Sequence, residues 1–157
     1  MCTCRCSSRL HLWQRRVRPI SDTPSPSAAI ETNILLRLWL NDAPAQNKRI
    51  DALLAEHGGT PGSLLVTDVV LAESVWTLRS AFDQDKAEQL LAIRSLLSET
   101  AFAFEDRDAV ARAADMFEQG NGGFSDCLVV AKHARHGCDF TVTFDRAMRK
   151  LRTVKLL

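Results

Sequence analysis

Residues 28–40 read AAIETNILLRLWL, and their pattern changes at one residue. Residues 28–30 form a short apolar run, as in a buried strand, whereas the apolar positions from 33 to 40 recur at helical spacing. Glu31 stands at the junction between the two patterns. The stretch therefore predicts a strand that ends at a carboxylate and passes directly into a helix.

The same alternation continues along the chain. Further strands are expected at 63–66, 101–105, 139–144 and 153–157, and further helices at 44–58, 67–82, 86–97, 106–120, 124–137 and 145–151. Strands that alternate with helices form a parallel sheet covered on both faces. The pattern predicts the α/β class with a mostly parallel central sheet.

The composition is that of an ordinary globular domain. The chain has 157 residues, 46% of them hydrophobic and 25% charged, which suits one domain with a sizeable core. No apolar run approaches the roughly 20 residues that a membrane-spanning helix needs. We therefore expect a soluble, cytoplasmic protein. The formal net charge of +1 does not by itself indicate a class of partner.

The first 27 residues differ from the rest. They contain five arginines against one acid, three of the five cysteines, and a Ser/Pro-rich end. Pro24 and Pro26 favour extended or turn geometry, so a boundary is expected near Ser27, with residues 28–157 as the domain. Residues 1–27 could be a metal knuckle, a targeting peptide or an extension without fixed structure, and we favour the extension.

The spacing of the cysteines gives little indication of a metal site, a disulfide or a catalytic pair. Cys2, Cys4 and Cys6 alternate, without the two-residue gap of ordinary zinc-binding pairs. Cys127 and Cys138 lie in or next to a predicted helix and are expected to be small buried thiols.

Four acids stand out by their surroundings. Glu31 and Asp145 each follow a predicted strand, and sites in open parallel sheets form beyond the carboxyl ends of the strands. Glu73 lies on or beside the apolar face of its helix, where a lone carboxylate is costly to bury. Asp126 opens a helix directly after a glycine-rich loop.

Each acid also has an ordinary structural explanation. Asp126 and Asp145 could cap helix amides, Glu73 could reach into solvent, and Glu31 could lie at the surface. Brought together, however, four carboxylates would repel one another and demand a cation. Oxygen ligands alone suit Mg²⁺ or Mn²⁺, which can polarise a phosphate and lower the pKa of a bound water. The acids thus predict a metal-dependent site for phosphodiester hydrolysis.

Four segments carry a shared pattern: AIETNILLR, VTDVVLAESVWTLRS, GGFSDCLVVAKHARHGCDFTVTFD and LRTVKLL. They resemble a PIN domain of the VapC toxin type, and the resemblance runs from about residue 28 to 157. It implies a three-layer α/β/α fold around a parallel sheet and Mg²⁺- or Mn²⁺-dependent endoribonuclease activity. It also implies the role of toxin in a type II toxin–antitoxin pair, with a cognate antitoxin protein, an RNA substrate and a homodimer of toxins.

The resemblance assigns roles by position. Glu31, Glu73, Asp126 and Asp145 match the family's metal-binding and catalytic acids. The polar residues expected to support them are Asn33 and Thr143.

One residue departs from the family's pattern. The first motif normally reads Asp-Thr-Asn, whereas this chain has Glu31-Thr32-Asn33. The carboxylate then sits one methylene further out, and a shift of about 1 Å could displace an octahedral ion or its water. We expect reduced nuclease activity, and the metal preference could change with it.

The end of the chain is basic. Residues 132–157 carry seven basic side chains against two acids, in a domain that is otherwise acidic. Phosphate contacts supply most sequence-independent affinity for nucleic acid, although a solvated helix face explains the charge nearly as well. The candidates for RNA binding are Lys132, Arg135, Arg146 and Arg149.

Two other functions remain open. The chain could be a weakened or inactive PIN module that binds RNA or a protein partner, with Glu31 marking a decayed site. It could also be a DNA-directed nuclease of the flap-cleaving type, for which it looks too short.

Overall fold

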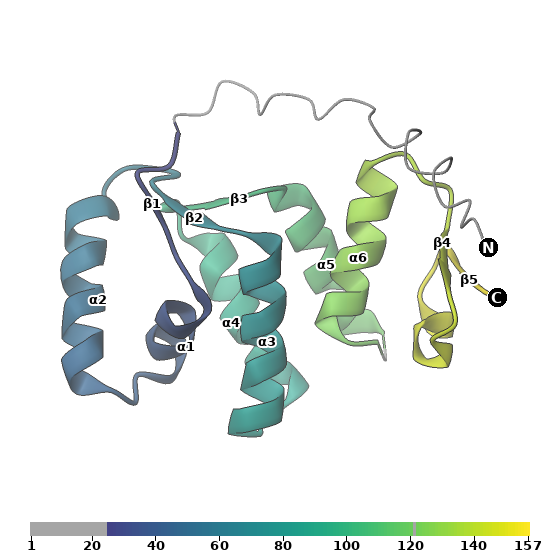
Figure 1. Ribbon diagram of the computed structural model, residues 1–157, viewed down its shortest axis with the longest axis horizontal. Coiled ribbons are helices and arrows are strands. Elements are labelled where there is room, and N and C mark those ends of the chain that lie inside the picture. The colour runs from purple at the N-terminus through teal and green to yellow at the C-terminus, as the bar shows by residue number, and fades with distance from the viewer. Residues whose placement is uncertain (1–24, 121) are drawn as a thin grey trace, which may run out of the picture.

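Figure 1 shows the computed structural model of the chain, which describes residues 25–120 and 122–157. In chain order the elements are β1 (Ala28–Ala29), α1 (Thr32–Leu40), α2 (Pro44–His57), β2 (Leu64–Val66), α3 (Asp68–Phe82), α4 (Lys86–Ser98), β3 (Phe102–Phe104), α5 (Arg107–Gln119), α6 (Phe124–Arg135), β4 (Thr141–Thr143), η1 (Arg146–Lys150) and β5 (Val154–Leu156). Each strand and helix expected from the sequence is present, and the last expected helix is the 3-10 helix η1. The prediction for residues 1–27 falls almost wholly on residues 1–24, which lie outside the described ones.

In the part of the chain that the structure describes, the strands are parallel and form two separate sheets. In the first, β2 lies between β1 and β3, with Ala28 opposite Leu64 and Leu64 opposite Phe102. In the second, β4 pairs with β5, and Thr141 lies opposite Val154. The α/β class and the parallel strands are confirmed. The division into two sheets is a finding that the alternation of strands and helices does not predict.

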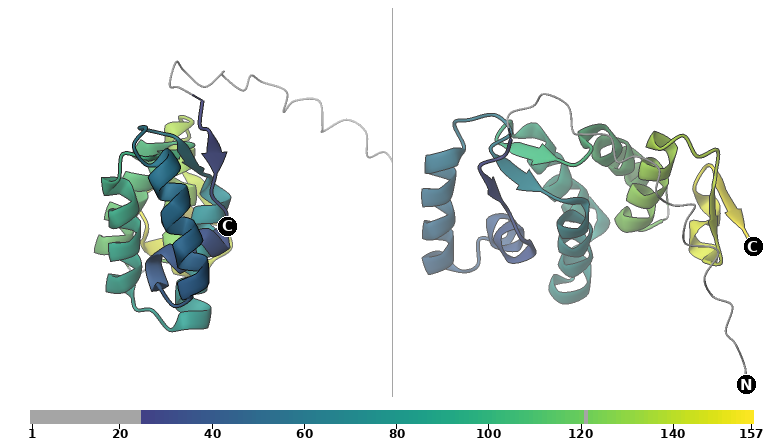
Figure 2. Two further views of the ribbon diagram at one scale, coloured as in Figure 1. Left: turned by 90° about the vertical axis from the view of Figure 1, so that its left-hand side faces the viewer. Right: turned by 45° about the horizontal axis from the view of Figure 1, so that its top comes forward.

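The two sheets lie on opposite sides of a pair of helices. In Figure 1, and in the right panel of Figure 2, α5 and α6 stand between β1–β3 and the β4–β5 end of the molecule. Within the described residues, β1 is therefore an edge strand, with β2 as its one neighbour in the sheet.

Local signals fix where several helices begin and end. The Thr67 side chain caps the first turn of α3, and Asp85 and Glu88 form a capping box at the start of α4. Helices α1 and α3 end at Asn41 and Asp83, which adopt left-handed backbone angles with φ of 50° and 51°. Short polar side chains tolerate this conformation because they can bond to the nearby backbone.

A single hydrophobic cluster connects the sheet, the helices and the basic end of the chain. Leu64 and Val66 of β2 are fully buried and belong to the same cluster as Val75 of α3. Met148 and Leu151 also belong to it, with exposed fractions of 7% and 6%. These two side chains therefore hold the β4–β5 end against the body of the molecule. Within the described residues, no helix combines the length and the apolar character needed to cross a membrane.

Candidate active site

Glu31 lies where the sequence predicts, at the junction of β1 and α1. Its backbone is extended, and its carboxylate accepts hydrogen bonds from the Ile34 amide at 3.2 Å and from Asn33 Nδ2 at 3.3 Å. Glu31 therefore caps the first turn of α1, and Asn33 orients the same carboxylate. A residue expected to support the Glu31 carboxylate must bond to it, and the hydrogen bond from Asn33 is such a contact.

Glu73 is connected to this junction through Thr32. The Thr32 hydroxyl donates a hydrogen bond to Glu73 Oε2 over 2.6 Å, across 41 positions of sequence. Glu73 itself is exposed, on the α3 surface that faces the start of α1. The chain thus brings the segments that carry Glu31 and Glu73 together at the carboxyl end of β1. The sequence analysis assigns no role to Thr32. The signal for a role is its hydroxyl group, which directly follows the first acid, Glu31.

Asp126 lies in the first turn of α6 and folds back on the glycine-rich loop. Its Oδ2 accepts a hydrogen bond from the Gly123 amide at 3.2 Å, and the residue is half-buried. A Cβ atom at Gly123 would lie 3.4 Å from the same oxygen, an ordinary contact distance, so the loop and the carboxylate pack closely without requiring a glycine here.

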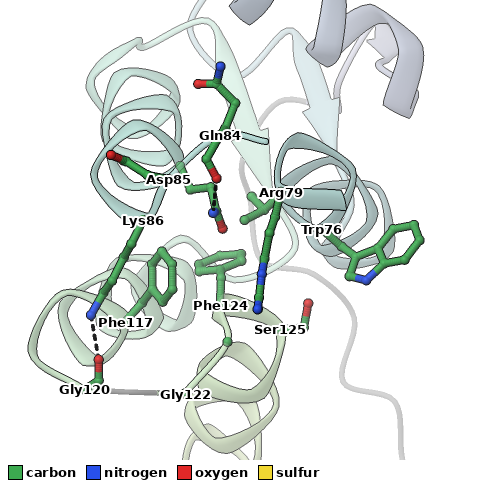
Figure 3. Close-up of a pocket in the computed structure, with 13 residues that line it drawn as sticks. Trp76, Arg79, Gln84, Asp85, Lys86, Phe117, Gly120, Gly122, Phe124 and Ser125 are labelled. Carbon is green, nitrogen blue, oxygen red and sulfur yellow. Dashed lines mark hydrogen bonds between the residues drawn. The ribbon is translucent and has the colours of Figure 1, made fainter. Parts of the chain in front are cut away.

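A cavity lies beside the start of α6. Its volume is about 350 Å³, with Trp76 and Arg79 of α3 and Ser125 of α6 among its lining residues (Figure 3). Lys86 of α4 donates a hydrogen bond to the Gly120 carbonyl, drawn as a dashed line in Figure 3. In the same view Arg79 points towards Ser125, whereas the Trp76 ring points away from the cavity. The hydrogen bond from Lys86 therefore ties the start of α4 to the end of α5, close to the start of α6.

Asp145 follows β4, as predicted, but β4 belongs to the second sheet. Its Oδ1 accepts a hydrogen bond from the Ala147 amide at 2.8 Å, and its own amide donates to Thr143 Oγ1 at 3.0 Å. Asp145 therefore begins η1, and Thr143 supports its backbone. Because α5 and α6 separate β4 from β1 in Figure 1, the chain does not place Asp145 beside Glu31.

The four acids consequently do not form a metal-binding cluster within one chain. Among residues 25–120 and 122–157, no group of three or more His, Cys, Asp or Glu side chains could hold a metal ion. The donor types fit a hard divalent ion, since all four are carboxylates. Their arrangement in this structure does not fit one, because no three of them lie together and Asp145 is held in the second sheet. The assignment of Glu31, Glu73, Asp126 and Asp145 to a metal stays a prediction.

A second pair of acids follows β2 and β3. Lys132 of α6 forms an ion pair with Asp68 Oδ2 at 2.6 Å and lies 4.0 Å from Glu105 Oε2. Burial, together with the neighbouring Asp68 carboxylate, raises the pKa of Glu105 above its ordinary value. Sequence reasoning passed over Asp68 and Glu105, although acids directly after strands were the signal that singled out Glu31 and Asp145.

Two of the four candidate RNA-binding residues already have acidic partners. Besides the pairing of Lys132, Arg135 Nε lies 2.9 Å from Asp106 Oδ2. Arg146 and Arg149 are exposed on η1, and no ion pair involves either of them within the described residues. Phosphate binding by Arg146 or Arg149 would break no internal ion pair of this kind.

The two cysteines of the described chain differ from each other. Cys127 is buried in α6, and burial, with the Asp126 charge next to it, raises the pKa of its thiol to about 11. Cys138 is exposed, because α6 ends at Arg135 and Gly137, with φ of 79°, turns the chain away from the body. The expectation of burial is right for Cys127 and wrong for Cys138.

Comparison with known proteins shows the family of the chain. The family model described as PIN domain matches residues 28–154. A curated relative, the VapC ribonuclease of Aquifex aeolicus (strain VF5), is 23% identical over 122 residues, which cover 78% of this chain and 90% of that protein. The chain therefore belongs to the PIN domain family, and within it resembles the VapC type.

Proposed function

We propose that the protein is a divalent-metal-dependent endoribonuclease and the toxin of a type II toxin–antitoxin pair. The observation that carries the proposal is the Thr32–Glu73 hydrogen bond, which joins the acid-bearing end of β1 to the acid-bearing face of α3 in a PIN domain. We infer that Glu31 and Glu73, 42 positions apart in the sequence, act together near this edge of the sheet, where parallel α/β proteins bind their ligands.

The residues proposed to hold the ion are Glu31, Glu73, Asp126 and Asp145, although no three of them lie together in this structure. A Mg²⁺ or Mn²⁺ ion bound by them would polarise the phosphodiester and lower the pKa of a coordinated water. Asn33 fixes the Glu31 carboxylate, and the hydrogen bond from the Gly123 amide fixes that of Asp126. These contacts orient the oxygens before any ion arrives, which reduces the entropy lost on binding.

RNA binding is assigned chiefly to η1. Arg146 and Arg149 are exposed there, one and four residues after Asp145, so a phosphate held by them would lie near that acid. Lys132 and Arg135 contribute less, because binding a phosphate would compete with Asp68 and Asp106. Contacts to phosphates alone confer little sequence preference and weaken steeply as salt rises.

The partners and the site of action follow from the same proposal. A toxin of this kind would act on cytoplasmic RNA, be held inactive by a cognate antitoxin protein, and associate as a homodimer. The relative named above is itself described as a VapC ribonuclease.

A weakened PIN module that binds RNA or a protein is the second candidate. Two observations favour it: the glutamate in place of aspartate at position 31, and the finding that no three of the four acids lie together within the described residues. Such a module would retain RNA binding but show no metal-dependent cleavage.

The test is RNA cleavage by the full chain during a titration with Mn²⁺ or Mg²⁺. We expect cleavage that requires the ion and falls by about 100-fold or more in Asp126→Asn, because the substitution removes one charged ligand while keeping the side-chain shape. Asp51→Asn, the same change on the exposed side of α2, is the matched control and should leave cleavage intact.

Two results would count against the proposal. Cleavage unaffected by Asp126→Asn would remove that residue from the catalytic site. If the wild-type chain binds RNA but does not cleave it at any concentration of either ion, the protein is a binding module and not a nuclease.

A further inference from the structure

A second cavity lies between α5, α6 and the turn that connects η1 to β5. Its volume is about 620 Å³, which is within the range of sites that hold small ligands or parts of larger ones. Gly120 lines this cavity and also the one beside the start of α6, so the two cavities are neighbours. The second one is called the α5–α6 cavity below, and the proposed function leaves it unused.

Part of the lining of the α5–α6 cavity is apolar and fixed. Val130 of α6 and Leu151 are buried, with exposed fractions of 3% and 6%, and Met116 of α5 packs against the core. The Leu151 side chain also lies against the loop before α6, because a Cβ atom at Gly122 would be 3.4 Å from its Cδ2 atom. A ligand would therefore meet a preformed apolar surface.

The charged part of the lining is basic. Arg112 of α5 lines the cavity together with Lys150 and Arg152, and none of the described residues that line it is acidic. All three cations are exposed, and no ion pair between described residues involves any of them. An anion bound by these side chains would break no such ion pair.

The turn that carries two of these cations is fixed by Thr153. This residue lines the cavity and has φ of 62°, in the left-handed region that β-branched residues rarely adopt. Its carbonyl accepts a hydrogen bond from the Thr141 amide at 2.7 Å, which fixes the start of β5 against β4. Strain of this kind persists where the surrounding structure enforces it, and it clusters at binding sites. The turn therefore has its shape before any ligand binds.

Cations beside an apolar surface suit a nucleotide. Its phosphates would meet the charges, while the base presents an apolar face to the aliphatic side chains. The position of η1 favours a strand over a free nucleotide: the helix runs from Arg146 to Lys150, with Arg149 also exposed on it. A strand bound along η1 reaches the α5–α6 cavity at its end.

We propose that the α5–α6 cavity binds an unpaired nucleotide of an RNA strand, with phosphates on Arg112, Lys150 and Arg152 and the base against Val130 and Leu151. The inference rests on the proposed function, from which it takes RNA as the substrate, and adds that the RNA is single-stranded. A base in a duplex is paired and stacked, so it enters a cavity only at the cost of leaving the stack.

Two other occupants fit the cavity less well. Residues 1–24 of the chain carry five arginines against one acid, and their charge opposes binding beside three cations. An acidic segment of another protein would match the charge, but its peptide groups would lose hydrogen bonds to water against the apolar lining. A base avoids that loss because its faces are apolar.

The first experiment measures RNA binding without cleavage. A fluorescein-labelled pool of single-stranded RNA octanucleotides of random sequence is titrated with the full chain in EDTA, and anisotropy gives Kd over a series of KCl concentrations. We expect Arg112→Gln to weaken binding about three- to ten-fold and to lower the slope of log Kd against log salt by about 0.7, the value for one lost contact between a cation and a single-strand phosphate.

The matched control for this variant is Arg49→Gln. Arg49 is exposed on α2, which stands at the opposite end of the molecule from β5 in Figure 1. The substitution removes the same charge, so it should leave the salt slope unchanged. Equal Kd values and slopes for Arg112→Gln and wild type would overturn the proposal, because they would show that this wall of the cavity does not contact RNA.

The second experiment places an acid inside the cavity. Ala134 of α6 lines it and is exposed, so a longer side chain there does not disturb the core. Ala134→Glu should weaken binding of the octanucleotides more than ten-fold, whereas Ala134→Gln, of the same size and without charge, should weaken it less. Ala52→Glu, the same charge change on the exposed side of α2, should bind nearly as wild type does. Equal Kd values for Ala134→Glu and Ala52→Glu would contradict the assignment of RNA to this cavity.

The third experiment asks whether a base enters. The wild-type chain is titrated with three probes of equal length: the single-stranded pool, duplex RNA and a strand without bases. We expect the single-stranded pool to bind at least several-fold more tightly than the other two, because they offer phosphates but no free base. Equal affinity for all three would show that phosphates alone are bound.

Competition against the labelled pool identifies any other occupant. Uridine 5′-monophosphate that displaces the pool as well as unlabelled RNA does would assign the cavity to a free nucleotide, and an equally effective oligoglutamate would assign it to an acidic protein segment. Either result would overturn the proposal. We expect unlabelled single-stranded RNA to displace the pool at far lower concentrations than both.

Failure of the inference and failure of the proposed function give different results. A chain that cleaves RNA with a divalent ion, and whose Arg112→Gln and Ala134→Glu variants bind RNA as wild type does, would keep the proposed function and lose the inference. A chain that binds single-stranded RNA through these residues but never cleaves it would lose the nuclease and keep the binding site.

Discussion

Glu31 shows how one residue can serve structure and chemistry at once. Its carboxylate caps α1 through the Ile34 amide and is held by Asn33, yet it also stands at the carboxyl end of β1. A cap uses one oxygen lone pair, which leaves others for an ion. The ordinary and the catalytic explanations of this residue are therefore compatible, and the same holds for Asp126 and Asp145, which also bond to backbone amides.

The length of the Glu31 side chain gives the first prediction. Glu31→Asp should raise the rate of metal-dependent RNA cleavage several-fold, because the shorter carboxylate matches the family's motif and an octahedral ion tolerates little displacement. The measurement is the initial rate for both chains over a range of Mg²⁺ and Mn²⁺. Equal or lower activity in the aspartate form would show that the added methylene does not limit the site.

The two thiols give the second prediction. Cys138 should react with iodoacetamide at neutral pH many times faster than Cys127, because the thiolate is the reactive form and the pKa of Cys127 is raised to about 11. Peptide mapping by mass spectrometry after timed alkylation separates the two sites. Comparable rates would mean that α6 opens on the timescale of labelling.

At the scale of elements, the junction of α5 and α6 depends on Asp106. Its Oδ1 caps α5 by accepting from the Ala109 amide at 3.0 Å, and its Oδ2 lies 2.9 Å from Arg135 Nε of α6. Burial alone would raise the pKa of Asp106, but the amide and the guanidinium together lower it below its ordinary value. One carboxylate thus both starts α5 and holds α6 beside it.

The third prediction separates these two roles. Asp106→Ala should lower the free energy of unfolding by about 1–2 kcal/mol, the usual cost of a lost cap, and Tm by roughly 2–8 °C. Asp106→Asn keeps a capping oxygen and should cost less, while Asp51→Asn, on the exposed side of α2, serves as the control. Equal unfolding curves for Asp106→Ala and wild type would show that Asp106 does not stabilise the junction of α5 and α6.

The contribution of Asp106 to the stability of the folded chain changes with pH in a definite direction. Because the pKa of Asp106 is lower in the folded chain, its contribution to stability is fully present above its unfolded value near 3.8 and is lost as pH falls through the folded value. Glu105 acts in the opposite sense: its raised pKa costs stability as pH rises above its ordinary value of 4.5. The half-exposed position of Glu105 keeps that cost small.

At the scale of the whole molecule, the sequence predicts local structure far better than the pairing of distant strands. The bounds of α1, α3 and α6 follow from apolar spacing and from residues such as Thr67 and Gly123, all within a few positions of each helix. The location of Glu31 and Asp126 at the ends of such elements could therefore be predicted. Each of these signals comes from residues within a few positions of the helix end that it marks.

The placement of β4 was beyond such reasoning. Thr141, Val142 and Thr143 read as a strand, but nothing in their spacing states which strand they join. The ion pairs of Lys132 and Arg135 were missed for the same reason, because their partners Asp68 and Asp106 lie far away in the sequence. The separation of Asp145 from the other acids thus depends on tertiary packing that periodicity does not encode.

The central claim is that the acids at the β1–α3 junction form a ribonuclease site, and Glu73 tests it most directly. The measurement is the rate of RNA cleavage at saturating Mn²⁺ by wild type, Glu73→Gln and Glu56→Gln, the last being the same change on the exposed side of α2. The account predicts that Glu73→Gln loses about 100-fold or more, because a charged ion ligand becomes neutral, whereas Glu56→Gln cleaves as wild type does. Equal rates for the two variants would contradict it.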